Sequence, residues 1–284
     1  MKVVLFCGGY GMRLREYSEQ VPKPMATIGY RPILWHIMKY YAHYGHRDFI
    51  LCLGWRADVI KSYFLQYEEC LSNDFVMSDG GARIDPLSRD IQDWRVTFVD
   101  TGVKATIGER LRAVAPHLDG EETFLANYAD GLTDLPLTRL TDFHRRRGGD
   151  ATFLAVKPSQ TFHCVDVDAD GRVNSLRSVE ASDVWINAGF FVLNRAVLED
   201  IRPGEDLVVE PFRRLISRGA LSALKHDGFF GCMDTFKEKQ LLDQMYTRGS
   251  APWQVWDRLQ PAPPLTAPGS AAAAAPISLP DRSR

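Results

Sequence analysis

The 284-residue chain lacks the segments that place a protein in or across a membrane. No apolar stretch approaches the roughly 18 residues that a membrane-spanning helix needs. The N-terminus runs directly into an apolar segment at residues 2–7, without the basic region and longer apolar core of a signal peptide. We therefore expect no membrane association and a cytoplasmic location.

An excess of basic charge and paired cysteines are also missing. Lysine and arginine (34) nearly balance aspartate and glutamate (36), and a net charge of −2 argues against nucleic-acid binding through a basic face. The five cysteines are scattered, and no two have the spacing of a metal site, so we interpret them as reduced thiols. Cys7 and Cys52 lie in apolar runs and are predicted to be small core residues.

Two common phosphate-binding glycine patterns, G-x-x-x-x-G-K-[ST] and G-x-G-x-x-G, are absent. Instead, Gly8, Gly9 and Gly11 fall within four positions after an apolar run, and Arg13 follows them. Glycines let backbone N–H groups surround an anion, and an arginine can hold two phosphate oxygens at once. For the glycines alone, an ordinary tight turn between a strand and a helix remains the alternative.

Lys23 lies between Pro22 and Pro24 and favours the phosphate site over the plain turn. A residue before proline is disfavoured in helical backbone, so we expect Lys23 on a stiff extended segment that presents its charge. Together, the glycines, Arg13 and Lys23 predict a polyphosphate site in which the two cations are catalytic.

Strand-like and helix-like segments alternate through the first half of the chain. This alternation predicts an α/β fold with a doubly wound, mostly parallel sheet, in which ligands bind beyond the C-terminal strand ends. The predicted strands are residues 2–7, 48–53, 94–100, 124–128 and 151–156, and the predicted helices are 33–45, 57–71, 108–118 and 137–147.

The second half adds a small β-hairpin and a C-terminal appendage. Asp170-Gly171 predicts a hairpin turn between residues 164–167 and 172–176. We expect one domain, residues 1–258, with a nucleotide-binding half (about 1–150) and a sugar-phosphate half (about 151–258); the Pro/Ala-rich composition of 259–284 predicts a disordered tail. Further strands are predicted at 185–193 and 221–226, and further helices at 207–217 and 235–248.

Two aspartates are candidates for binding Mg²⁺, which prefers one or two carboxylates beside substrate phosphates. Asp130 follows a buried strand, and Gly131 allows close approach. Asp234 directly precedes a predicted helix, so capping of that helix is an equally good interpretation of its position.

These residues belong to motifs that resemble the sugar-1-phosphate nucleotidylyltransferases, and most closely the glucose-1-phosphate cytidylyltransferases. The resemblance extends from residue 1 to about residue 256. Its motifs are Gly8-Gly9-Tyr10-Gly11-Met12-Arg13-Leu14, Pro22-Lys23-Pro24-Met25, Ile33-Leu34-Trp35-His36-Ile37-Met38, Val99-Asp100-Thr101-Gly102, Ala129-Asp130-Gly131, Ile186-Asn187-Ala188-Gly189, Met233-Asp234-Thr235 and Ala251-Pro252-Trp253.

The resemblance implies a nucleotidyltransferase fold and a reaction of CTP with glucose 1-phosphate that yields CDP-glucose and pyrophosphate, in a homo-oligomer. Arg13 would hold the pyrophosphate, Lys23 would neutralise the α-phosphate, and Asp130 and Asp234 would carry Mg²⁺. The residues implied in nucleotide binding are Phe6, Cys7, Gly8, Gly9, Tyr10, Gly11, Met12, Arg13, Lys23, Arg110 and Ala129.

On the sugar side, the resemblance implies contacts from Asn187, Gly189 and Glu210. The Glu-Lys-Pro element of the family is missing before Ile186, and Arg177 is our candidate to replace its lysine. Three alternatives stay open: the same reaction with UTP, dTTP or a modified hexose 1-phosphate, a metal-dependent glycosyltransferase, and a non-catalytic nucleotide-binding subunit.

Overall fold

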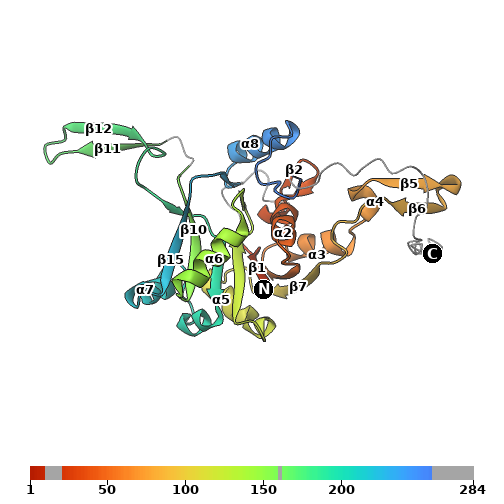
Figure 1. Cartoon of the computed structure of the whole chain (residues 1–284), viewed down its shortest axis with the longest axis horizontal. Helices are drawn as coiled ribbons and strands as arrows, with labels where there is room; N and C mark the ends of the chain where they lie inside the picture. Colours follow the sequence, from red (N-terminus) through yellow and green to blue (C-terminus); the bar gives the residue numbers. More distant parts are fainter. Residues whose placement is uncertain (10–20, 159–161, 258–284) are drawn as a thin grey trace.

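A computed structural model describes residues 1–9, 21–158 and 162–257 of the chain (Figure 1). The predicted site residues Tyr10, Gly11, Met12 and Arg13 lie outside these ranges, as does the predicted tail at 259–284.

Four parallel strands form the N-terminal half of the central sheet. They lie in the order β8-β1-β4-β7, and each pair of neighbours runs in the same direction. Their carboxyl ends therefore meet at one edge, where a ligand site is expected in such sheets. The strands are β1 (Val3–Phe6), β4 (Asp48–Leu53), β7 (Arg95–Asp100) and β8 (Thr123–Tyr128).

The C-terminal half makes this sheet mixed. One strand, β14, lies antiparallel between β8 and β10, while β15 is parallel to β10 on its other edge. The predicted α/β fold is confirmed, although the eight-stranded sheet is less parallel than expected. The strands of this half are β10 (Ala151–Val156), β13 (Ile186–Asn187), β14 (Phe191–Asn194) and β15 (Leu221–His226).

The strand predicted at residues 185–193 is divided into β13 and β14. Gly189 (φ +78°) and Phe190 (φ +49°) adopt left-handed backbone, which interrupts an extended strand. The buried Asn127 side chain stabilises this break, because its Oδ1 accepts a hydrogen bond from the Phe190 N–H at 2.9 Å. The prediction of one long strand is therefore wrong.

Helices cover both faces of the sheet, as a doubly wound fold requires. Along β1, Val3 and Leu5 pack with the helices of one face, whereas Val4 and Phe6 pack with those of the other. On the first face lie α2 (Ile33–His43), α3 (Ala57–Leu65) and α6 (Leu137–Arg147), and on the second α5 (Ile107–Val114) and α7 (Glu210–Ser217).

Three helices are shorter in the structure than predicted. The helix expected at 57–71 ends at Leu65, and a separate turn, α4 (Glu69–Ser72), follows. Between them the chain turns so that the Tyr67 hydroxyl reaches the Asp90 carboxylate at 3.1 Å. The helix expected at 108–118 becomes 3-10 in its last turn, η4 (Ala115–Leu118), and that expected at 207–217 begins at Glu210.

Two hairpins project from opposite sides of the molecule (Figure 1). The predicted hairpin is confirmed as β11 (His163–Val167) and β12 (Val173–Ser178), while β5 (Phe75–Ser78) and β6 (Arg83–Pro86) were not predicted. Within the described ranges, no helix is both long and apolar enough to span a bilayer.

Candidate functional site

Lys23 lies between two carboxylates from distant parts of the chain. Its Nζ is 2.5 Å from Oδ2 of Asp130, and it also donates a hydrogen bond to Oδ1 of Asp234. Burial alone would lower the pKa of Lys23, whereas the charge of Asp130 raises it. The resulting pKa lies above the ordinary value for lysine. The ammonium therefore stays charged at neutral pH and holds the two acidic groups together.

The backbone at Lys23 differs from the prediction. Lys23 is not extended but opens a short 3-10 helix, η2 (Lys23–Met25), and the extended residue is Pro22. Pro24 is tolerated in the first turn because the N–H that it lacks would have no helical partner there. The segment is stiff, but its conformation was wrongly predicted.

A short antiparallel ladder brings Asp130 and Asp234 together. In it β9 (Gly131–Thr133) pairs with β16 (Phe230–Cys232), so that Gly131 lies opposite Cys232. The Met233 N–H donates to the Asp130 carbonyl at 2.9 Å and extends this pairing to the aspartates. Two acids 104 positions apart in the sequence thus share one site because their flanking strands pair.

The capping interpretation of Asp234 is wrong. The residue that caps α8 (Phe236–Thr247) is Thr235, whose hydroxyl accepts from the Glu238 N–H, while the Glu238 carboxylate accepts from the Thr235 N–H. Asp234 lies one position outside this capping box, and its carboxylate faces Lys23.

A cavity of about 480 Å³ opens beside Lys23 at the carboxyl edge of the parallel strands. Its volume suits a small-molecule ligand. Of the predicted site residues, those that line it are Phe6, Cys7, Gly9, Lys23, Arg110, Ala129 and Asp130. The other lining residues are Pro24, Val103, Ala105, Thr106, Ile107, Tyr128 and Asp206.

The Arg110 side chain packs against Gly8 and is held there by hydrogen bonds. Its guanidinium donates to the Thr101 hydroxyl at 2.6 Å and the Leu53 carbonyl at 3.2 Å. A Cβ atom on Gly8 would lie 1.9 Å from Arg110 Nη1, whereas one on Gly9 would meet no atom of the described residues within 4 Å. A side chain on Gly8 would therefore displace the Arg110 guanidinium, and one on Gly9 would not.

Residues 2–235 match the family model described as nucleotidyl transferase. The chain belongs to the nucleotidyl transferase family. The "Glucose-1-phosphate cytidylyltransferase" of Salmonella typhi is 40% identical over 260 residues, which cover 90% of this chain and all of that protein. The "Probable glucose-1-phosphate cytidylyltransferase" of Bacillus subtilis (strain 168) is 36% identical over 258 residues, with the same coverage of both chains.

Solved structures agree with this family's fold. An apo UDP-glucose pyrophosphorylase superposes with a TM-score of 0.66 over 88% of this chain and 99% of its own, at 14% identity. At that identity the similarity shows the α/β fold alone.

The predicted sugar-side residues of this nucleotidyl transferase do not line the 480 Å³ cavity. The Asn187 side chain accepts a hydrogen bond from the Gly189 N–H at 2.9 Å on the segment that joins β13 to β14. Glu210 begins α7, and Asp206, four residues earlier, lines the cavity instead. Arg177 is exposed on the projecting β11–β12 hairpin (Figure 1).

Two cations beside Trp185 were not predicted as site residues from the sequence. Lys157 and Lys225 each place their Nζ over the Trp185 ring, at 4.7 and 4.8 Å from its centroid. Lys225 and Asn187 both pair with Ala155, from opposite edges of β10, so their side chains share one face of the sheet. Only the strand order reveals this alignment, which has no signature in the sequence.

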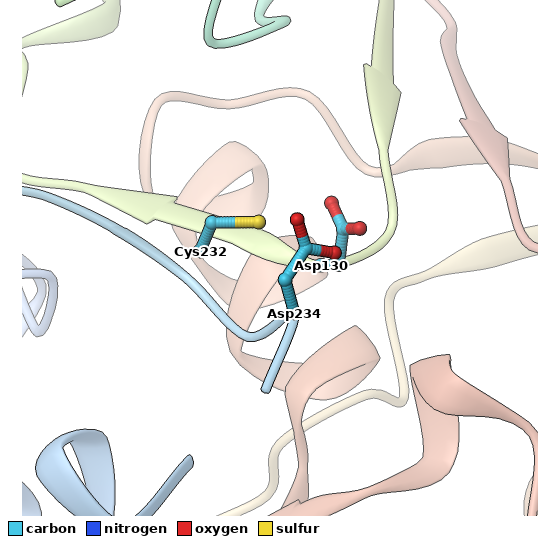
Figure 2. A group of neighbouring side chains, drawn as sticks. All are labelled: Asp130, Cys232 and Asp234. Carbon is cyan, nitrogen blue, oxygen red and sulfur yellow. The ribbon is translucent and has the colours of Figure 1, made fainter. Parts of the chain in front are cut away.

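Cys232 was also not predicted as a metal ligand, because only cysteines at the regular spacing of a metal site were considered as ligands. Its Sγ and one oxygen from each of Asp130 and Asp234 all lie within 4.8 Å of one another (Figure 2). Burial, followed by the charge of Asp130, raises the pKa of the Cys232 thiol.

The two carboxylates fit a divalent cation. They already hold a positive charge between them, the Lys23 ammonium, and their oxygen ligands are the type that Mg²⁺ prefers.

Proposed function

We propose that the chain transfers a cytidylyl group from CTP to glucose 1-phosphate, forming CDP-glucose and pyrophosphate. The observation that carries this proposal is the convergence of Lys23, Asp130 and Asp234 beside the cavity at the carboxyl edge of the sheet. The names of relatives at 36–40% identity support cytosine as the base and glucose 1-phosphate as the acceptor.

In this reaction an oxygen of the sugar phosphate attacks the α-phosphorus of the triphosphate, and the bond to pyrophosphate breaks on the opposite side. The protein contributes orientation and charge rather than covalent chemistry. Lys23 neutralises the α-phosphate, Arg13 holds the departing pyrophosphate, and Asp130 and Asp234 hold Mg²⁺. When bound, Mg²⁺ offsets charge on the phosphate oxygens.

Lys23 shares its two carboxylates with the metal that they would hold. The ammonium bonds one oxygen of Asp130 and one of Asp234, so a bound Mg²⁺ would take these oxygens or the second oxygen of each carboxylate. Lys23 also lines the cavity, and we propose that its ammonium turns toward the α-phosphate there when the nucleotide binds.

For the acceptor, we propose that Asn187 contacts the sugar and that Lys225 binds its phosphate. Lys225 shares a face of the sheet with Asn187, whereas Arg177 lies on the projecting hairpin, and this placement supports Lys225 over Arg177. Exposed apolar side chains on that hairpin, including Val165 and Leu176, support the proposal of a homo-oligomer.

Pyrophosphate release from a matrix of CTP, UTP, dTTP, ATP and GTP against several hexose 1-phosphates with Mg²⁺ tests the function. We expect CTP with glucose 1-phosphate to give the highest kcat/KM. Lys23→Ala should retain the fold by circular dichroism and lose about a hundredfold or more in rate. A preference for UTP or dTTP would overturn the cytidylyl assignment, and no release with any pair would overturn nucleotidyl transfer.

A further inference from the structure

We propose that Cys232 is a third ligand beside Asp130 and Asp234, and that this centre binds thiophilic divalent cations such as Cd²⁺ or Zn²⁺. The inference rests on the proposed function, because it concerns the same carboxylate pair. Figure 2 shows the Cys232 thiol pointing toward the two carboxylates, and the three ligand atoms lie within 4.8 Å of one another.

The backbone holds these three residues in place. Cys232 ends β16, pairs with Gly131 of β9, and is followed by the Met233 N–H bonded to the Asp130 carbonyl. Because this ladder fixes the Cα positions, closing the ligand set onto an ion would fall to the side chains.

A cation has room between the ligands and a route to the sulfur. The Lys23 ammonium now lies between the carboxylates, which marks a space where positive charge is favourable. Cys232 also lines a second cavity, of about 520 Å³, whereas Asp130 lines the cavity of about 480 Å³. Two of the three ligands therefore border a cavity.

The donor set decides which cations are favoured. Mg²⁺ takes oxygen ligands and gains little from sulfur, whereas a thiolate strongly favours Zn²⁺ and similar soft ions. Bonds of about 2.3 Å to sulfur and about 2.0–2.2 Å to oxygen require ligand atoms roughly 3.5 Å apart, so a pair at the 4.8 Å limit would have to close by roughly 1 Å. On binding, the metal–sulfur bond forms, the S–H bond breaks, and the proton passes to water.

Titration of the full-length protein with Cd²⁺ alone tests the proposal. We expect a sulfur-to-cadmium charge-transfer absorption in the ultraviolet that is absent in Cys232→Ser, together with a loss of about tenfold or more in Cd²⁺ affinity by calorimetry. Mg²⁺ affinity, measured in parallel, should fall by much less. Cys164→Ser, on the hairpin, is the matched control and should retain both the absorption and the affinity.

Asp130→Asn and Asp234→Asn should keep the absorption but weaken Cd²⁺ binding, which would assign all three ligands to one centre. An unchanged absorption in Cys232→Ser would overturn the proposal, as would equal losses of Cd²⁺ and Mg²⁺ affinity. The absorption needs no nucleotide. If the protein shows the Cys232-dependent absorption but releases no pyrophosphate, the proposed function is rejected. The assignment of Cys232 as a metal ligand still stands in that case.

Discussion

Charge balance around Lys23 determines what the centre can bind. Burial opposes a charged ammonium, yet the pKa of Lys23 is raised, so its interactions with the two carboxylates outweigh the cost of burial. A divalent cation carries twice the charge of an ammonium and therefore gains more from these oxygens than a monovalent one.

Asp234 and Thr235 are adjacent, but we expect their substitutions to have opposite effects. Asp234→Ala should lower the rate of pyrophosphate release by about a hundredfold or more, because it removes a proposed metal ligand. Its unfolding midpoint in urea should stay close to that of the parent, since Thr235 caps α8 without it.

Thr235→Ala is the matched control for Asp234→Ala. It removes the helix cap and should cost about 1 kcal/mol of unfolding free energy in the same urea titration. Its turnover should be largely retained. If Asp234→Ala kept a near-normal rate, the carboxylate would have no part in the reaction.

At the level of elements, the turn after β1 is shaped by its contact with α5. Gly8 follows β1, and Arg110 of α5 reaches across to Gly8 while bonding the end of β4 at Leu53. The two interpretations of the glycines from the sequence, steric turn and anion site, are thus compatible. Gly8 leaves room for the Arg110 side chain, and Gly9 lines the cavity.

This difference predicts unequal effects of two neighbouring substitutions. Gly8→Ala must displace the buried Arg110 guanidinium and break its hydrogen bonds, which should cost about 1–3 kcal/mol of unfolding free energy. Gly9→Ala meets no atom of residues 1–9, 21–158 or 162–257 within 4 Å and should change that energy by less than about 0.5 kcal/mol. Chemical denaturation of both variants checks this, and equal losses would contradict the role of Arg110.

Long regular elements were predictable from the sequence, and short pairings were not. Residues 48–53, 137–147 and 151–156 are apolar or periodic over at least six positions, and the structure reproduces them as predicted. By contrast, β9 and β16 have three residues each and no alternation to read. Their pairing nevertheless assembles the carboxylate centre.

At the level of the whole molecule, the segment at residues 251–257 packs on α2. The Trp253 indole N–H donates to His36 Nδ1 at 3.4 Å, and the other ring nitrogen of His36 lies 3.2 Å from the Ile28 carbonyl. This arrangement needs a neutral imidazole that accepts at Nδ1 and donates at Nε2. Burial accordingly lowers the pKa of His36 to about 4.

The shifted pKa of His36 predicts a loss of stability in acid. In the unfolded chain its pKa is about 6.5, so between about pH 6.5 and 4 the unfolded state binds a proton that the folded state does not. Protonation therefore favours unfolding, and roughly 2 kcal/mol of unfolding free energy should be lost between pH 7.5 and pH 5.

Urea denaturation at pH 7.5 and pH 5 measures the unfolding free energy that each protein loses on acidification. His36→Gln should lose less than the parent, and the difference is the contribution of His36. His163→Gln, on the exposed hairpin, should keep the slope of the parent. The same slope in His36→Gln as in the parent would show that His36 does not carry the acid sensitivity.

By itself, the sequence determined most of the long strands and helices, the glycines after the first strand, and Lys23 and Asp130 as candidates, because local patterns encode all of these. Only the tertiary structure decided that Asp234 and Cys232 join them, that Arg110 packs under Gly8, and that Lys225 faces the Asn187 side of the sheet. Each of these contacts joins segments at least 32 residues apart. Such contacts depend on which strands pair and which faces pack, and no local pattern records that choice.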